Sequence, residues 1–100
     1  YDIFCSPCHD RTGGGNGMVV QRGFSRPSSF HTEKLRQRPA GHFYIIITKG
    51  LDAMPSYASQ VPPADRWAIA AYIRALQLSQ NATAAHVPPA RLGELNGDAR

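Results

Sequence analysis

Apolar residues recur at helical spacing between positions 65 and 80, and this is the strongest hydrophobic pattern in the chain. On such a helix Trp67, Ala70 and Ala71 share one face, and Pro63 suits the first turn because it has no backbone N–H to leave unpaired. Small alanine side chains let a second helix approach closely. The pattern therefore predicts a long helix that packs through this face against another helix.

Two shorter segments in the middle of the chain also indicate helices. Residues 28–37 are mainly polar and begin with two serines, which predicts a short helix with a serine N-cap. Residues 41–50 contain a β-branched apolar run that is compatible with a strand. No second strand is available to pair with it, and Lys49-Gly50 is typical of a helix C-terminus, so we expect a short buried helix.

The two ends of the chain differ from this middle part. Tyr1 and Phe4 lie three positions apart, which predicts two core aromatics in a helix that begins upstream of Tyr1 and packs on the long helix. From position 81 the sequence turns to proline, glycine and mixed charge, after a glycosylation sequon at 81–83 of a kind that is frequent by chance. We therefore expect an all-α domain of three to four short helices over residues 1–80 and an extended tail over residues 81–100.

Composition narrows the functional classes. The chain has 100 residues, 42% of them hydrophobic, which fits one globular domain and excludes disorder throughout. A domain of this size tends to need a covalent link or a cofactor to complete its core. The formal net charge is +4, but the arginines are scattered, so nucleic-acid binding is not expected and an acidic protein partner is favoured.

The only two cysteines of the chain belong to the motif Cys5-Ser6-Pro7-Cys8-His9. Cys-x-x-Cys-His is the attachment signature of c-type haem. Each of the two thiols can add to one vinyl group of the macrocycle, and the histidine directly after them supplies an axial nitrogen to the iron. The motif therefore predicts one haem c, attached through Cys5 and Cys8 and ligated by His9.

Other interpretations of these cysteines are less well supported. A thioredoxin-like dithiol needs a preceding strand and a βαβ setting, which the pattern does not provide. A structural zinc site needs a fourth ligand, and His31 and His42 do not lie at the spacing of known zinc motifs. A disulfide between the cysteines leaves His9 unexplained. The glycine-rich residues 10–17 lack the Gly-Lys-Ser/Thr of a phosphate loop and fit a tight loop against a flat ligand.

A second axial ligand is predicted in the middle of the chain. Met54 lies 45 positions after His9, which is enough chain to reach the opposite face of a haem, and Pro55 keeps it in an extended loop. Met18 follows His9 by only nine positions, so it is a weaker candidate and is otherwise expected to pack. His42 is a third candidate, which would give the iron two histidine ligands. We favour His9 and Met54.

Further residues are candidate haem contacts. The Pro27 carbonyl suits the task of accepting the proton of the distal ring nitrogen of His9, which fixes the orientation of the ring. Tyr57 follows the methionine loop and could pack on the macrocycle or hydrogen-bond a propionate. Tyr44 is the last candidate. His31, by contrast, is expected at the surface.

Histidine–methionine ligation leaves no open position on the iron for oxygen, peroxide or a substrate. The predicted role is therefore one-electron transfer rather than catalysis, with the thioether raising the reduction potential. A haem enzyme or gas sensor with a weakly bound sixth ligand is the alternative from another functional class.

The haem motif, Lys49-Gly50, Met54-Pro55 and the tryptophan-bearing helix occur together in one short chain. Over residues 1–80 this combination resembles class I mono-haem cytochromes c. Residues 17–24, 54–58, 61–69 and 71–77 carry a narrower resemblance, to the mono-haem cytochrome subunit of bacterial alternative complex III, a quinol-oxidising membrane assembly.

The narrower resemblance implies a peripheral subunit that receives electrons from a multi-haem cytochrome subunit and passes them to an oxygen reductase or a soluble cytochrome. Covalent haem attachment implies maturation outside the cytoplasm, so the expected location is the periplasmic face of the bacterial cytoplasmic membrane. No signal segment or membrane span is visible in residues 1–100. A free periplasmic carrier and the cytochrome c domain of an oxidase subunit are the alternatives.

Overall fold

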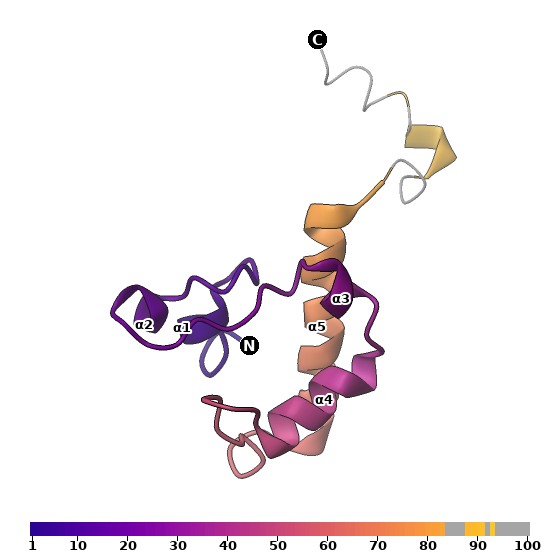
Figure 1. Ribbon diagram of the computed structural model, residues 1–100. Helices are drawn as coiled ribbons and strands as arrows, with labels where there is room; N and C mark the ends of the chain where they lie inside the picture. The colour runs from indigo at the N-terminus through magenta and orange to yellow at the C-terminus, as the bar shows by residue number, and fades with distance from the viewer. Residues whose placement is uncertain (84–87, 92, 94–100) are drawn as a thin grey trace.

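The computed structural model describes residues 1–83, 88–91 and 93, and its elements are all helical (Figure 1). They are α1 (Ser6–His9), α2 (Met18–Gln21), α3 (Glu33–Arg36), α4 (Ala40–Lys49), α5 (Pro63–Asn81) and the 3-10 helix η2 (Pro89–Arg91). Leu51 and Met54 form one isolated β-bridge, and the described residues contain no strand. The predicted all-α class is confirmed.

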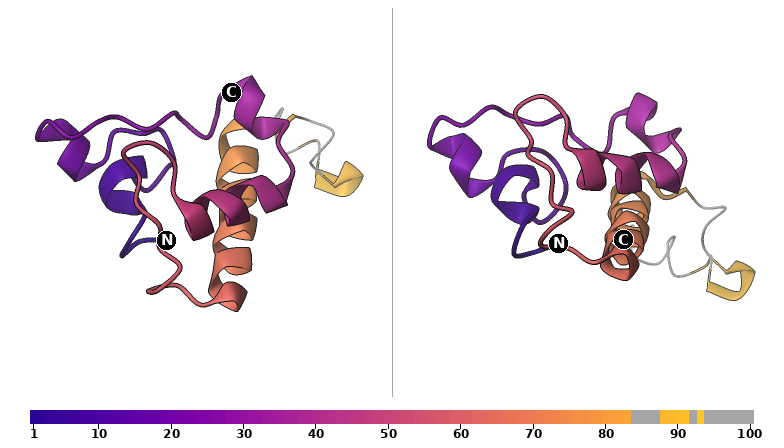
Figure 2. Two further views of the ribbon diagram at one scale, coloured as in Figure 1. Left: turned by 60° about the horizontal axis from the view of Figure 1, so that its bottom comes forward. Right: turned by 90° about the horizontal axis from the view of Figure 1, so that it is seen from below.

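Helix α5 is the longest element, and α4 packs across it (Figures 1 and 2). Pro63 occupies its first turn, as predicted, and its buried side contains Ile69, Ala70 and Ile73. Trp67 is 52% exposed, so the predicted packing face is partly wrong. The face is centred on the larger aliphatic side chains because burying them removes more apolar surface from water than the alanines alone would.

Helix α4 confirms the buried helix predicted over residues 41–50. It buries Phe43 and Ile47 against α5 and leaves Ile45 on the solvent side. The helix ends at Gly50, whose φ of +76° is unfavourable for any other residue. A side chain there would also approach the Met54 carbonyl oxygen to 2.6 Å, so the loop that follows α4 can fold back closely only with glycine at this position.

Helix α3 is shorter than the predicted helix over residues 28–37, and its N-cap is not a serine. Thr32 caps it by accepting a hydrogen bond from the Leu35 N–H. Ser29 lies before the helix, where its hydroxyl accepts from the His31 N–H. The helix begins late because Phe30 is buried in the core and its carbonyl accepts a hydrogen bond from the Gln77 side chain.

At the start of the chain, the predicted contact with the long helix is present for one aromatic residue only. The Tyr1 ring lies 5.0 Å from the ring of Tyr72 on α5, and its hydroxyl donates to the Asp10 carbonyl oxygen at 2.6 Å. Phe4 is 38% exposed and contacts Tyr57 instead, so its predicted place in the core is wrong.

Helix α5 ends at Asn81, and Ala82 is already extended. Most of the predicted tail, residues 84–87, 92 and 94–100, lies outside the described residues, and the boundary between domain and tail stays a prediction. Over the described ranges, no helix has the length and apolar character needed to cross a membrane.

Candidate functional site

The cysteine motif forms its own helical turn, α1. The His9 N–H donates to the Cys5 carbonyl oxygen at 2.9 Å, and the Cys8 N–H donates to the same oxygen at 3.2 Å. Residues three apart on a helical turn lie on one side of it, so the two thiols face the same way. Both cysteines are free and partly buried. The disulfide alternative is therefore not formed, and no strand precedes the motif in the described part of the chain.

The two nitrogens of the His9 ring have different surroundings. The ring stacks on Phe30, with centroids 4.6 Å apart and planes at 17°. Nδ1 is buried and has no hydrogen-bond partner among the described residues. Nε2 also makes no hydrogen bond there but is open to solvent. Burial lowers the pKa of His9, and the negative charge of Asp10, which acts to raise that pKa, only partly offsets this. The ring therefore stays neutral, with a lone pair free for a metal.

The predicted hydrogen bond from His9 to the Pro27 carbonyl is not formed in this structure. The Pro27 oxygen lies instead against Gly15, where a Cβ would approach it to 2.6 Å. Gly15 therefore lets the segment that carries Pro27 pass close to the loop that follows His9. The close approach at Gly15 is thus to another backbone segment, whereas the glycine-rich residues predicted an approach to a flat ligand. The Nδ1 atom of His9 has no acceptor among the described residues.

Facing the motif is the loop that joins α4 to α5 and carries Met54. Leu51 and Met54 exchange two backbone hydrogen bonds of 3.0 and 2.9 Å, which makes a tight turn. The Tyr57 N–H donates to the Ile47 carbonyl oxygen at 2.9 Å and ties the loop to α4. Burial and the nearby thiols of Cys8 and Cys5 raise the pKa of Tyr57, while its predicted contact with a haem stays a prediction.

A buried arginine that the sequence analysis missed fixes this loop. Arg66 is only 9% exposed and donates to the Val61 and Ala58 carbonyl oxygens at 2.8 and 3.0 Å. It also donates to the Thr48 hydroxyl at 3.3 Å. A buried guanidinium is stable only where its donors are satisfied, so these bonds hold the loop, α4 and α5 together. Its place in the first turns of an amphipathic helix gave no signal of burial.

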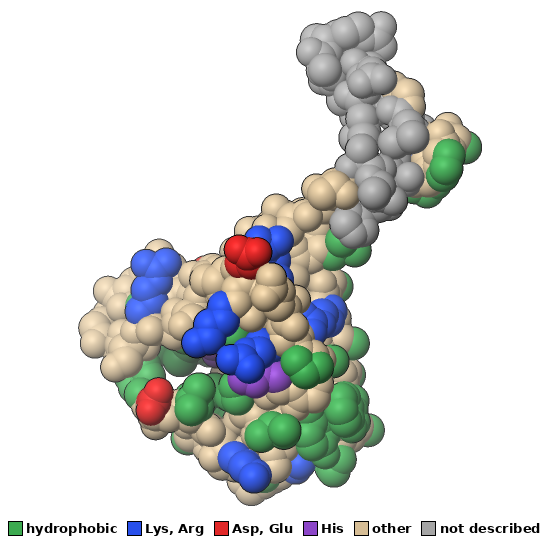
Figure 3. All heavy atoms as spheres, turned by 45° about the vertical axis from the view of Figure 1, so that its right-hand side comes forward, with side chains coloured by type: hydrophobic (Ala, Val, Ile, Leu, Met, Phe, Trp, Pro, Cys, Tyr) green, Lys and Arg blue, Asp and Glu red, His purple; other side chains and the backbone are tan. Residues whose placement is uncertain are grey.

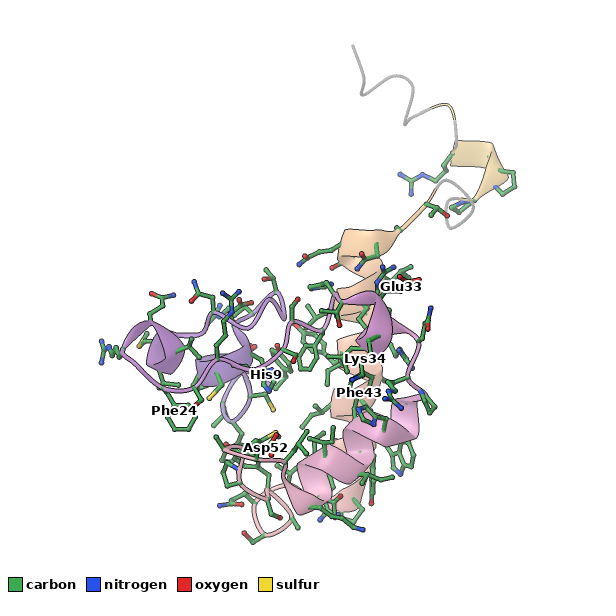
Figure 4. The ribbon with its side chains drawn as sticks, in the orientation of Figure 1. His9, Phe24, Glu33, Lys34, Phe43 and Asp52 are labelled. Atoms are coloured by element: carbon green, nitrogen blue, oxygen red, sulfur yellow. The ribbon has the colours of Figure 1, made fainter. Side chains whose placement is uncertain are left out.

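An opening separates α1 from the methionine loop. Figure 4 shows His9 and Asp52 on opposite sides of it, and Figure 3 shows hydrophobic side chains along its border. Several large apolar side chains are solvent-exposed in the described structure: Met18 (62%), Phe24 (49%) and Leu51 (57%). None of the large described side chains is less than 2% exposed. The described core therefore lacks an apolar component, and a flat hydrophobic group of the size of a haem fits this need.

The comparison with protein families gives one match. The model of the family described as cytochrome C oxidase, cbb3-type, subunit III matches residues 1–73, which include the motif, the methionine loop and most of α5. The chain belongs to this family. It is a class I c-type cytochrome with covalently attached haem c, and an electron carrier rather than an enzyme. No curated protein matches the chain.

The residues present fit the haem of this cytochrome family. Two free thiols on one side of α1 and an open Nε2 are the donors that attachment and axial ligation need. Cys5 and Cys8 would hold the macrocycle, and His9 would ligate the iron, which supplies one reversible electron. Among the described residues no three acidic, cysteine or histidine side chains group into another metal site.

The structure also shows where the remaining candidate haem contacts and iron ligands lie. Met18 is exposed on α2, so its predicted packing is wrong. Tyr44 stacks on Trp67 at 4.4 Å and lies beneath Arg66, on the side of α4 that meets α5. His31 is not a free surface residue, because its ring nitrogens bond to the Thr12 carbonyl oxygen and the Asn81 amide. His42 is half-exposed at the start of α4.

Asp10 orders the loop directly after His9. Its carboxylate accepts hydrogen bonds from the Thr12 side chain and from the backbone N–H groups of Thr12, Gly14 and Asn16. Burial alone would raise the pKa of this carboxyl, but these hydrogen bonds outweigh it and lower the pKa to about 2. The sequence analysis did not single out Asp10.

Replacing Asp10 with asparagine should therefore make the cytochrome less stable and less sensitive to acid. The carboxyl pKa is about 2 in the folded chain against 3.8 for the free group, so its stabilisation is complete above about pH 4. It is lost as the pH falls towards 2. We expect a loss of about 1 kcal/mol at neutral pH, measured by denaturant unfolding across this range. Asp2→Asn is the control, and equal acid profiles in the two variants would contradict the prediction.

Proposed function

We propose that His9 and Met54 are the two axial ligands of the haem iron and that the chain relays single electrons within a respiratory membrane complex. The proposal is supported above all by one observation. His9 and the loop of Met54, marked by Asp52 in Figure 4, lie on opposite sides of the same opening. A haem bound there would have a nitrogen on one face and a thioether on the other, with no position left for a substrate.

The thioether suits a carrier because it favours ferrous iron and raises the reduction potential above that of a bis-histidine haem. The loop that carries it is braced by Arg66 and by backbone hydrogen bonds to α4. A rigid second ligand limits the rearrangement that accompanies each change of oxidation state. The chain's own contribution is thus to hold both ligands in place and to exclude water from the macrocycle.

The complex that we favour is alternative complex III, on the periplasmic face of the cytoplasmic membrane, with a multi-haem cytochrome subunit as donor. The support is the resemblance of the stretches around Met18, Met54 and Trp67. A second candidate, the cytochrome c domain of an oxidase subunit, is favoured by the family match over residues 1–73.

Purification of the native protein in mild detergent separates these candidates. We expect it to elute with a multi-haem cytochrome and quinol-oxidising activity. Elution with a haem–copper oxidase would favour the oxidase subunit, and elution as a lone soluble monomer would favour a free carrier. Carbon monoxide should not change the spectrum of the reduced protein. Its binding would indicate an enzyme or sensor with an open iron position and would overturn the ligation proposal.

A further inference from the structure

A concentration of positive charge covers α3 and the start of α4 (Figure 3). We call it the basic patch, and it consists of Lys34, Arg36, Arg38 and Arg74. A shallow depression there is lined by Glu33, Lys34, Gln37 and Arg38. Among the described residues that line it, only Glu33 carries a carboxylate, and its oxygen accepts a hydrogen bond from the Gln37 amide at 3.3 Å. The patch therefore keeps a clear excess of positive charge.

No carboxylate of the described residues forms an ion pair with the charges of the basic patch. Lys34 and Arg38 are exposed, and their side chains make no hydrogen bond or ion pair within the described part of the molecule. Burial and the charges of Arg38 and Lys34 lower the pKa of the neighbouring His42. Like charges held this close repel one another, and an acidic surface brought against them would relieve the repulsion.

Hydrogen bonds hold two side chains of the basic patch, those of Arg36 and Arg74, in place. The Arg74 guanidinium donates to the Arg36 carbonyl oxygen at 3.2 Å and to the Gln77 side chain at 2.8 Å. The Arg36 guanidinium in turn donates to the His31 carbonyl oxygen at 3.1 Å. These bonds join α3 to α5, so the positive charges keep a defined spacing. A preorganised surface loses less conformational entropy when a partner docks.

Aromatic rings connect this surface with His9. The Phe30 ring stacks on His9 at 4.6 Å and meets the edge of Phe43 at 6.0 Å. The Arg74 guanidinium lies 5.3 Å above Phe43, and the His42 ring lies 5.5 Å from it. The patch is thus joined to the axial histidine by packed rings.

We propose that the basic patch is the docking surface for an acidic one-electron redox protein. The inference rests on the proposed function, because it takes His9 as the axial ligand. A haem held by Cys5, Cys8 and His9 would supply a one-electron centre, and the docked partner would be oxidised as that centre is reduced, or the reverse. No bond or proton would be transferred. The rings of Phe43 and Phe30 would connect the docked partner with His9.

The test uses the haem-loaded protein and reduced plant-type ferredoxin, a small acidic one-electron donor. In the variant Lys34→Gln/Arg38→Gln, the rate of reduction at low ionic strength should fall by roughly tenfold or more. The matched control, Arg11→Gln/Arg22→Gln, removes two exposed charges elsewhere and should stay within about twofold of the parent. Both pairs should approach the parent rate at high salt. Equal losses in the two pairs, or none in either, would overturn the proposal.

A binding measurement separates docking from electron transfer. Calorimetry with oxidised ferredoxin should show weakened binding for the patch variant and unchanged binding for the control. If the parent binds ferredoxin through the patch but its spectrum excludes His9 as a ligand, the proposed function fails while the docking surface stands. If the patch variant loses binding only to vesicles of anionic phospholipid, the surface faces lipid and the proposal is wrong.

Discussion

Replacing both Cys5 and Cys8 with serine should leave the protein without covalently bound haem. The two thiols are the only ones in the chain, and both are free on one side of α1. Serine hydroxyls do not form thioethers with the vinyl groups. On a denaturing gel the parent should stain for haem and the double variant should not. A denatured variant that still carries haem would refute the attachment site.

The stability of this variant should fall by several kcal/mol. The described core is small, and large apolar side chains such as Met18 and Leu51 stay exposed without a group to cover them. A domain of this size has a total stability of roughly 5–15 kcal/mol, so the loss should leave much of the chain unfolded. Circular dichroism would show reduced helix content. Ser6→Ala, within the same motif, is the control and should keep the haem.

Replacing Met54 with alanine should remove the absorption band of the thioether–iron bond in the far red and lower the reduction potential. The expected drop is on the order of a hundred millivolts, within the range of about 0.8 V that axial ligands control. Optical redox titration measures both effects. The reduced variant should also begin to bind carbon monoxide, because a position on the iron becomes open.

Met18→Ala is the matched control for this experiment. Met18 is 62% exposed on α2, so its loss should change neither the band nor the potential. If the band disappears in the Met18 variant and survives in the Met54 variant, the ligand is Met18. If neither variant changes the spectrum, a histidine such as His42 would have to be tested instead.

Local patterns were sufficient to predict much of this molecule. The haem motif, the buried α4 and the position of α5 depend on residues that are close in sequence, such as Lys49-Gly50 at the end of a helix. Family-level function followed from the motif because covalent attachment constrains spacing so strongly. These features need no knowledge of how distant segments pack.

The wrong predictions concern contacts between distant segments. The late start of α3 depends on Gln77, 47 positions after Phe30. The burial of Arg66, for which no prediction was made, depends partly on the Thr48 hydroxyl, 18 positions earlier. Neither relation leaves a periodic trace in the sequence. Trp67 follows helical spacing yet faces solvent, because spacing gives the members of a face and not the direction in which that face points.

The two buried polar side chains of α5 have a joint consequence. Arg66 holds the loop of Met54, and Gln77 holds Phe30, on which His9 stacks. They lie eleven residues apart on the same helix, which corresponds to a distance of about 16 Å along its axis. The length of α5 between these two residues therefore sets the distance between the loop of Met54 and the His9 side of the opening. An insertion or deletion of a single residue between them would rotate Arg66 relative to Gln77 about the helix axis. One of the two side chains would then lose its hydrogen bonds, and the separation of the two sides of the opening would change.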